Sequence, residues 1–182
     1  MKKTVFILLW VVLSVQAYSQ KGDLTVGAKV GCIYSNSQID YTNILYGIDV
    51  AYHLSNPLEV ALTCLMNPNI PRDKSTLAVY SNNLDFRLYL IHMQAWATGP
   101  ALGGQYLIVD DKTEKLGAYK AMGFNIGWHI RANLTDNLKI NGGWRYANAK
   151  AKDKSIYWSS SSSIDISHHL FYVGIAYTFE LR

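Results

Sequence analysis

The strongest constraint on the fold is an alternation of apolar residues with small or polar residues. In 44–53, the even positions are apolar from Ile44 to Tyr52, whereas the odd positions include Gly47 and Asp49. Successive side chains of a strand point to opposite faces, so a period of two predicts β-structure. The pattern predicts eight strands, at 24–34, 44–53, 58–66, 84–91, 96–108, 118–132, 138–147 and 168–181.

One predicted strand is interrupted. Segment 96–108 contains Pro100, Gly103 and Gly104. Proline has no N–H to donate to a neighbouring strand, so we expect a β-bulge at Pro100.

The connections between these strands alternate in length. Segments 54–57, 92–95 and 133–137 are short, and the remaining connections are long and polar, at 35–43, 67–83, 109–117 and 148–167. Long loops at one end and tight turns at the other are typical of outer-membrane barrels. Most of the strands approach the 9–11 residues that a tilted membrane strand needs. The sequence therefore predicts an all-β, eight-stranded antiparallel up-and-down transmembrane β-barrel, with both ends of the domain on the short-turn, periplasmic side.

The N-terminal segment has the pattern of a secretory signal. Lys2 and Lys3 precede an apolar run from Val5 to Val15, and small residues at 17 and 19 mark a cleavage site before Gln20. We predict a signal peptide at 1–19 and a barrel domain at 20–182. An uncleaved N-terminal helix is the alternative, although a membrane-spanning helix needs about 20 apolar residues. Loss of the two lysines lowers the net charge from +4 to +2, which gives no case for nucleic-acid binding.

Aromatic residues on the outward faces form a second pattern. We assign five to the long-loop ends of their strands: Tyr34, Tyr46, Tyr106, Trp144 and Tyr146. We assign five others to the short-turn ends: Tyr52, Trp96, Trp128, Tyr177 and Phe179. Aromatic girdles on either side of an aliphatic belt mark the two membrane interfaces, so this pattern supports a membrane barrel.

The opposite faces carry small residues and a set of charges. The predicted interior network is Lys29, Asp49, Glu59, Asp85, Arg87, His129, Arg131, Lys139, Arg145 and Glu180. Eight strands leave an interior just wide enough for side chains to fill. Opposite charges that pair inside such a barrel offset their desolvation. We therefore interpret these residues as a structural core rather than a catalytic cluster, and we expect at most a narrow transient pore.

Two stretches resemble a known class of proteins. Segment 138–146, LKINGGWRY, looks like the penultimate strand of small OmpX-type, OmpA-domain and opacity-type outer-membrane barrels. Segment 171–179, FYVGIAYTF, resembles their last strand, which the barrel-assembly machinery recognises, although here the chain continues through Glu180–Arg182. The resemblance implies an outer-membrane location, but this class includes adhesins, stress-response barrels and structural proteins, so it does not specify a function.

Two alternatives stay open. A soluble lipocalin-like carrier has the same alternation with its apolar face inside. A lipid A-modifying enzyme would need a Ser–His arrangement, and residue types for it occur at Asp165, Ser167, His168, His169 and the Ser159–Ser163 run. His129 has no Ser two residues later, so it does not match the arrangement expected of a lipid A deacylase.

Other chemistry has weaker support. Cys32 and Cys64 lie on outward faces with a strand between them, so no disulfide is expected. We predict no catalytic residue, no metal site and no cofactor.

The long loops are the most plausible functional surface, because binding residues often lie on loops held by a rigid scaffold. Segment 148–167 supplies the candidate surface-binding residues, which are Lys150, Lys152, Lys154, Tyr157 and Trp158. Lysines and aromatics there suit lipopolysaccharide phosphates or an unknown extracellular ligand. The expected protein is a monomer with a structural, surface-binding or adhesion role among outer-membrane lipids.

Overall fold

The computed structural model describes residues 22–36, 40–67, 77–111, 118–152 and 163–180. Its strands are β1 (Leu24–Asn36), β2 (Asp40–Ser55), β3 (Leu58–Asn67), β4 (Leu77–Leu88), β5 (Ile91–His92), β6 (Trp96–Asp111), β7 (Ala118–Asn133), β8 (Leu138–Lys152), β9 (Ser163–Asp165) and β10 (His168–Phe179). In this part of the chain, no helix is long and apolar enough to cross a membrane.

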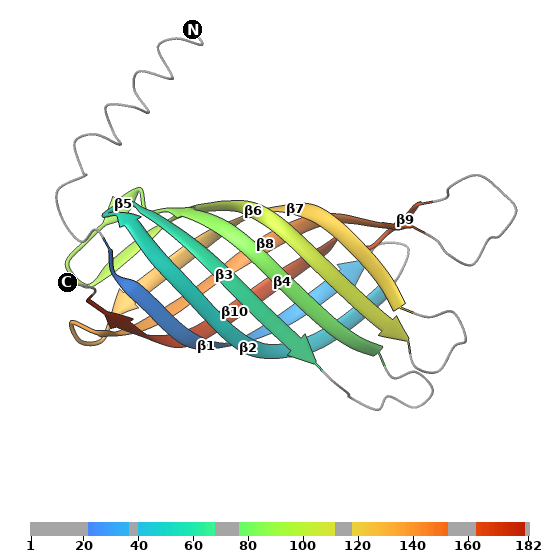
Figure 1. Ribbon diagram of the computed structural model, residues 1–182, viewed down its shortest axis with the longest axis horizontal. Helices are drawn as coiled ribbons and strands as arrows, with labels where there is room; N and C mark the ends of the chain where they lie inside the picture. The colour runs from blue at the N-terminus through green and yellow to red at the C-terminus, as the bar shows by residue number, and fades with distance from the viewer. Residues whose placement is uncertain (1–21, 37–39, 68–76, 112–117, 153–162, 181–182) are drawn as a thin grey trace, which may run out of the picture.

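The strands close into an antiparallel barrel, which confirms the predicted fold class. Sequential strands pair around the ring, and β10 pairs with both β8 and β1 (Figure 1). The wall contains β1, β2, β3, β4, β6, β7, β8 and β10, while β5 and β9 are short additions paired with β6 and β8. Every strand of the wall therefore has two partners, and no edge is left open.

The strands are tilted, and the register measures the tilt. Register partners can be followed once around the barrel, starting at Tyr52 on β2 and ending at Thr42 on the same strand. The path runs through Val60, Phe86, Leu102, Ile126, Tyr146, His169 and Tyr34. The return point lies ten residues from the start, and this stagger is the shear that a tilted barrel requires.

Several strands extend beyond their predicted limits at the long-loop end. β4 begins at Leu77 rather than at 84, and β8 ends at Lys152 rather than at 147. At this end of β8 the polarity of the two faces is reversed. The inward side chains of Ala149 and Ala151 are apolar and buried, whereas the outward side chain of Lys150 is charged and exposed. The outward face becomes polar beyond the apolar part of the barrel, so the apolar alternation alone stops too early.

The bulge expected at Pro100 is wrong. The β6–β7 register runs without a break from Trp96 to Asp110, and the β4–β6 register ends at Arg87 opposite Ala101. Pro100 therefore lies next to the point where pairing with β4 stops, and proline is tolerated at such a strand margin. A register shift is found instead in the β2–β3 pair, between His53 and Ser55 of β2.

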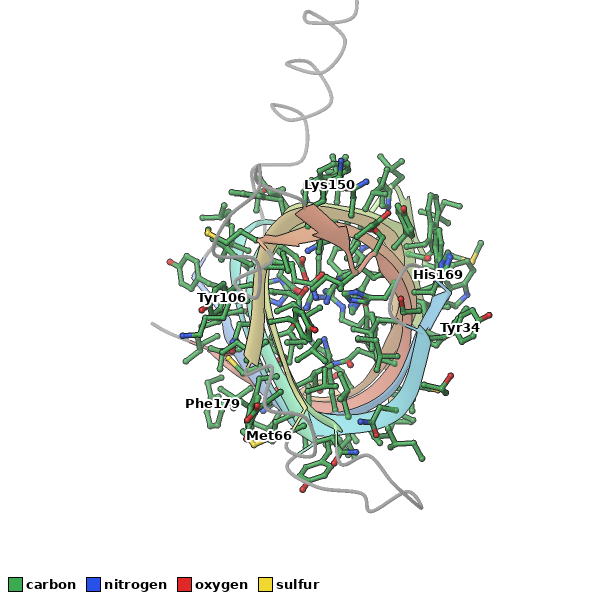
Figure 2. All side chains as sticks on the ribbon, turned by 90° about the vertical axis from the view of Figure 1, so that its right-hand side faces the viewer. Tyr34, Met66, Tyr106, Lys150, His169 and Phe179 are labelled. Atoms are coloured by element: carbon green, nitrogen blue, oxygen red, sulfur yellow. The ribbon has the colours of Figure 1, made fainter. Side chains whose placement is uncertain are left out.

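The outer face carries a continuous apolar belt. Large apolar side chains are exposed on each strand of the wall, for example Ile48, Leu84, Leu102, Ile126 and Ile175. Figure 2 shows side chains projecting on both sides of the ring, with the outer set pointing away from the barrel. The soluble carrier alternative requires the opposite arrangement, so the belt contradicts it.

Candidate functional site

The centre of the barrel interior is organised around Arg87. Its guanidinium binds Asp49 at 2.7 Å and Glu59 at 2.7 Å. Asp49 also forms an ion pair with Lys29 at 2.8 Å and accepts a hydrogen bond from the hydroxyl of Thr63 at 2.6 Å. All five side chains are buried. One arginine thus links β2, β3 and β4 across the interior.

A second group lies toward the short-turn end. Arg131 approaches Glu59 at 3.4 Å and stacks over the ring of Tyr89, whose centroid is 4.4 Å from the guanidinium carbon. The imidazole of His53 lies 3.3 Å from Glu59. The alternation in 44–53 and 84–91 places His53 and Tyr89 on inward faces, but the predicted network included only charged groups and His129.

Two of the remaining predicted interior residues, Arg145 and His129, contact Tyr172. Arg145 binds Asp85, and its guanidinium carbon lies 5.4 Å from the centroid of the Tyr172 ring. His129 shares a hydrogen bond of 3.0 Å with the Tyr172 hydroxyl. Lys139 is buried near the short-turn end of β8.

The placement of Glu180 in this network is wrong. β10 ends at Phe179, and Glu180 is exposed beyond it. The alternation predicts an inward side chain only while the strand continues. Among the described residues, the buried charges of the interior are three acids and five bases, an excess of positive charge: Asp49, Glu59, Asp85, Lys29, Arg87, Arg131, Lys139 and Arg145.

The long-loop half of the interior is apolar, which the sequence interpretation missed. The buried cluster includes Ile33, Leu45, Leu65, Leu107 and Leu170, each at most 2% exposed. Ile33, Leu45 and Leu65 were on the predicted inward faces, whereas Leu107 and Leu170 were assigned to no face, and small and charged residues dominated the interpretation of the interior. The interior therefore contains a charged layer around Arg87 and an apolar layer nearer the long loops, with buried uncharged polar side chains such as Gln105 and His168 as well.

The ten girdle aromatics project outward, but their division between two interfaces is partly wrong. Trp128 and Trp144 were assigned to opposite girdles, yet they are register partners in the β7–β8 pair. Trp128 donates a hydrogen bond of 2.6 Å to the hydroxyl of Thr98. Phe124 and Phe171 are exposed aromatics between the two predicted girdles.

A compact aromatic cluster lies where the apolar belt ends toward the long loops. His169 stacks on Trp144 with ring centroids 5.8 Å apart and accepts a hydrogen bond from the indole N–H at 3.2 Å. The ring of Tyr146 lies 5.1 Å from the His169 ring, and Tyr34 is the register partner of His169 on β1 (Figure 2). We call these four residues the rim cluster.

Two exposed lysines lie beyond the belt on the adjoining strands. Lys150 is four residues past Tyr146 on β8, and Lys120 lies on β7, two residues past Met122, the register partner of Lys150. Asp165 is the register partner of Lys150 on β9.

The carboxylate of Asp165 is stabilised by hydrogen bonds from Ser167. Its carboxylate accepts hydrogen bonds from the Ser167 hydroxyl at 2.6 Å and the Ser167 amide at 2.9 Å, and these bonds hold the pKa of Asp165 below its usual value. A second acid, Asp110, lies in the same region on β6 and is partly exposed.

The residues considered for hydrolysis are not brought together. The Ser167 hydroxyl donates to Asp165 rather than to a histidine. The imidazole of His168 points inward, where Nε2 lies 3.0 Å from the amide nitrogen of Gln105. His169 points outward in the rim cluster.

Part of the predicted loop surface cannot be placed. Lys154, Tyr157, Trp158 and most of the Ser159–Ser163 run lie outside the described residues, as does the predicted signal peptide at 1–19. Lys152 ends β8, and its side chain is not among those described. Of the candidate loop residues, Lys150 alone has a described side chain.

Comparison with solved structures shows the fold. The chain resembles the outer membrane protein OprG from Pseudomonas aeruginosa, with a TM-score of 0.68 and 11% identity over 89% of this chain and 98% of that one. It resembles Neisserial surface protein A, with a TM-score of 0.62 and 15% identity over 87% and 100%. It also resembles the attachment invasion locus protein Ail of Yersinia pestis, solved with the heparin analogue sucrose octasulfate, with a TM-score of 0.54 and 13% identity over 88% and 100%.

Sequence comparison adds no family. No family model matches the chain, and no curated protein matches it. The shared fold is that of small outer-membrane barrels, as the resemblance in 138–146 and 171–179 implied. An exposed apolar belt around a closed barrel is the arrangement that a bilayer requires. The belt and the fold together assign this chain to an outer membrane.

Proposed function

We propose that this barrel is a non-catalytic outer-membrane protein whose long-loop rim binds anionic lipid headgroups of the outer leaflet, the phosphates of lipid A. The observation that carries the proposal is the rim cluster of Tyr34, Trp144, Tyr146 and His169 at the end of the apolar belt, with Lys120 and Lys150 beyond it. Aromatic rings are stable at a membrane interface, and ammonium groups at that depth meet lipid phosphates.

The geometry of the rim supports this ligand class. The stacked rings of Trp144 and His169 give a flat aromatic surface suited to a sugar face, and the lysines lie further from the belt, where phosphates are found. Because Ser167 already satisfies much of Asp165, that carboxylate competes less for the Lys150 ammonium. Ail, a neighbour in fold, has been solved with a sulfated sugar analogue.

The interior supports a structural rather than a transporting role. The apolar layer that includes Leu45, Leu65 and Leu107 fills the long-loop half of the barrel, and the ion pairs of Arg87 fill the centre. The proposal includes a monomeric barrel in which this filled interior acts as a rigid support for the rim and the long loops. A further extracellular ligand of residues 152–158 is part of the same proposal.

Assembly through the C-terminal strand is also part of it. The last strand ends with Tyr177 and Phe179, whose exposed rings pack edge to face at 4.9 Å. The barrel-assembly machinery would bind this aromatic end. Phe179→Ala should then lower the amount of folded barrel in outer membranes, while Phe124→Ala, on another part of the belt, should have a smaller effect. Heat-dependent migration on a denaturing gel measures the folded fraction.

The headgroup proposal is tested by lipid binding in detergent micelles. Lys120→Ala/Lys150→Ala should weaken binding of bis-phosphorylated lipid A by about tenfold or more, because two phosphate contacts are lost. Asn148→Ala, between the rim cluster and Lys150, is the matched control and should bind as the wild type does. Dephosphorylated lipid A should bind both proteins equally. Equal binding of phosphorylated lipid A by the lysine variant and the wild type would contradict the proposal.

A further inference from the structure

The outward face of β1 is a furrow between two ridges. Its floor consists of the small or short side chains of Cys32, Val30, Ala28 and Val26, and we call these four residues the furrow. On one side lie Ile44 and Ile48 of β2, and on the other lie Phe171 and Ile175 of β10. The four wall residues are each at least half exposed. The furrow results from the strand register. Ile44, Cys32 and Phe171 are register partners on neighbouring strands, so the short side chain of Cys32 lies between two longer ones.

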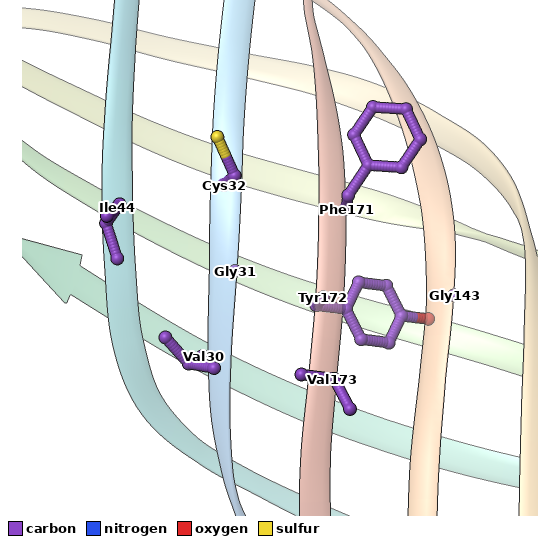
Figure 3. Close-up of a pocket in the computed structure, with 8 residues that line it drawn as sticks. All are labelled: Val30, Gly31, Cys32, Ile44, Gly143, Phe171, Tyr172 and Val173. Atoms are coloured by element: carbon purple, nitrogen blue, oxygen red, sulfur yellow. The ribbon is translucent and has the colours of Figure 1, made fainter.

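The furrow contains two hollows in succession. The first, of about 510 Å³, lies over Val30 and Cys32 between Ile44 and Phe171 (Figure 3). The second, of about 400 Å³, lies over Val26 and Ala28. The two hollows follow each other along the outward face of β1.

The upper end of the furrow is continuous with the rim cluster. Tyr34 and His169 are register partners, and Cys32 and Phe171 are partners two residues closer to the short turns. A molecule whose headgroup lies at the rim cluster therefore meets the furrow directly below it. The third hollow, of about 320 Å³ around Gly104, lies on β3, β4, β6 and β7; Met122, the register partner of Lys150, lines it, but no residue of the rim cluster does.

We propose that the furrow binds one acyl chain of a lipid A molecule whose phosphorylated headgroup is held at the rim. This inference rests on the proposed function and adds the site of the hydrocarbon part. From Val26 to Cys32 the furrow measures about 20 Å at roughly 3.3 Å per residue. With the usual tilt of about 35–45°, it descends about 15 Å along the membrane normal. That depth equals half of a hydrocarbon core of about 30 Å, which is the reach of a chain from one leaflet.

The shape of the furrow distinguishes a chain from a second copy of the barrel. Lipid tails are as apolar as the side chains of the belt, so covering those side chains gives little hydrophobic free energy. Preference for one ligand therefore depends on close van der Waals packing. The floor of the furrow is the single strand β1, side chains of β2 and β10 stand on both sides of it, and the two hollows also reach Gly143 and Leu138 of β8. A thin, flexible acyl chain can lie between these side chains, whereas a second barrel would contact only the outer ends of Ile44 and Phe171.

The test fills the furrow and measures lipid retention by native mass spectrometry of the full barrel in micelles with lipid A or phosphatidylethanolamine. Ala28→Leu/Cys32→Leu should lower the retention of lipid A by about tenfold. Gly104→Leu, which fills the third hollow on the same belt, is the matched control and should retain lipid A as the wild type does. Heat-dependent gel migration verifies that each variant is folded.

A second measurement uses the native thiols of the unaltered protein. Cys32 lies in the furrow and Cys64 lies on the outer face of β3, and both are free. Lipid A should slow alkylation of Cys32 by a membrane-permeant maleimide severalfold, with alkylation of Cys64 unchanged. Equal protection of both thiols would show general coverage of the belt and would overturn the inference.

The outcomes separate this inference from the proposed function. If filling the furrow has no effect while the Lys120/Lys150 variant loses lipid A, the acyl site is wrong and the headgroup proposal stands. If filling the furrow releases lipid A while the lysine variant retains it, the headgroup proposal is wrong and the furrow stands. Preferential retention of phosphatidylethanolamine, or a dimer that disappears on filling, would overturn lipid A as the occupant.

Discussion

His168 and His169 are neighbours in sequence but lie on opposite sides of the barrel wall. His168 is 1% exposed and contacts Gln105 in the interior, whereas His169 stacks on Trp144 at the outer surface. The wall of the sheet separates the two imidazoles, so they have no common substrate. Their arrangement supports a role for His169 in the rim and a packing role for His168.

This separation predicts that the barrel does not modify lipid A. Cells that make the wild-type protein, the His168→Ala/His169→Ala variant or no protein should give the same lipid A mass spectrum. The Ser167 hydroxyl is held by Asp165, which leaves no histidine to activate it in the described part of the chain. A modified lipid A species that depends on the intact histidines would identify an enzyme.

Loss of the central arginine should strongly destabilise the barrel. Arg87→Leu leaves Asp49 and Glu59 buried without their main counter-charge, and breaking such a pair costs about 3–5 kcal/mol. Urea unfolding in lipid vesicles measures the change in the free energy of unfolding. Lys120→Ala, on the exposed rim, should change it by less than about 0.5 kcal/mol. A similar change for both variants would show that the interior ion pairs contribute little.

Charge on the belt should be costly at mid-depth and tolerated near its edge. Ile126→Arg places a guanidinium in the middle of the belt on β7, where the expected cost is about 2–4 kcal/mol. Asn148→Arg lies beyond the belt on β8 and should cost about 0–1 kcal/mol. Vesicle unfolding experiments on the two variants test the position of the membrane. Equal costs would mean that the belt is not the lipid-facing surface.

Two adjacent glycines should differ in their tolerance of the same substitution. In Gly103→Ala the new methyl group meets the carbonyl oxygen of Leu84, whereas in Gly104→Ala it points into open space. The first change should destabilise the barrel by about 1–3 kcal/mol through overpacking, and the second should be nearly neutral. Unfolding midpoints compare the pair directly, and a destabilised Gly104→Ala barrel would contradict the described β6 orientation.

Ser167 should tune the protonation of Asp165. The Ser167 hydroxyl and amide hold the pKa of Asp165 below its ordinary value of 3.8, and Ser167→Ala should raise that pKa by removing the hydroxyl. A folded-state pKa below the unfolded one stabilises the fold above pH 3.8, and the effect is lost as the pH falls through the lower value. Carboxyl carbon NMR in micelles measures the titration. Thr178→Ala, at the other end of the barrel, should leave it unchanged.

The sequence predicted the strands well because each wall residue has one of two environments, lipid or interior. This binary choice is what a period of two records, and it placed Asp49, Arg87 and Ile126 on their observed faces. Register is different, because it depends on which residues of two strands meet. Trp128 and Trp144 were separated for this reason, although pairing brings them together. The rim cluster also depends on register, since His169 and Tyr34 are distant in sequence.

The closing pair of strands has a consequence for the timing of folding. Leu24 on β1 meets Phe179 on β10, so the wall is completed only when the two ends of the described chain come together. Long-range closure of this kind carries a large loop entropy and is slow compared with local pairing. Until that closure, β1 and β10 each have an unpaired edge that can join another chain. We therefore expect the unfolded protein to associate through these edges unless they are covered before insertion.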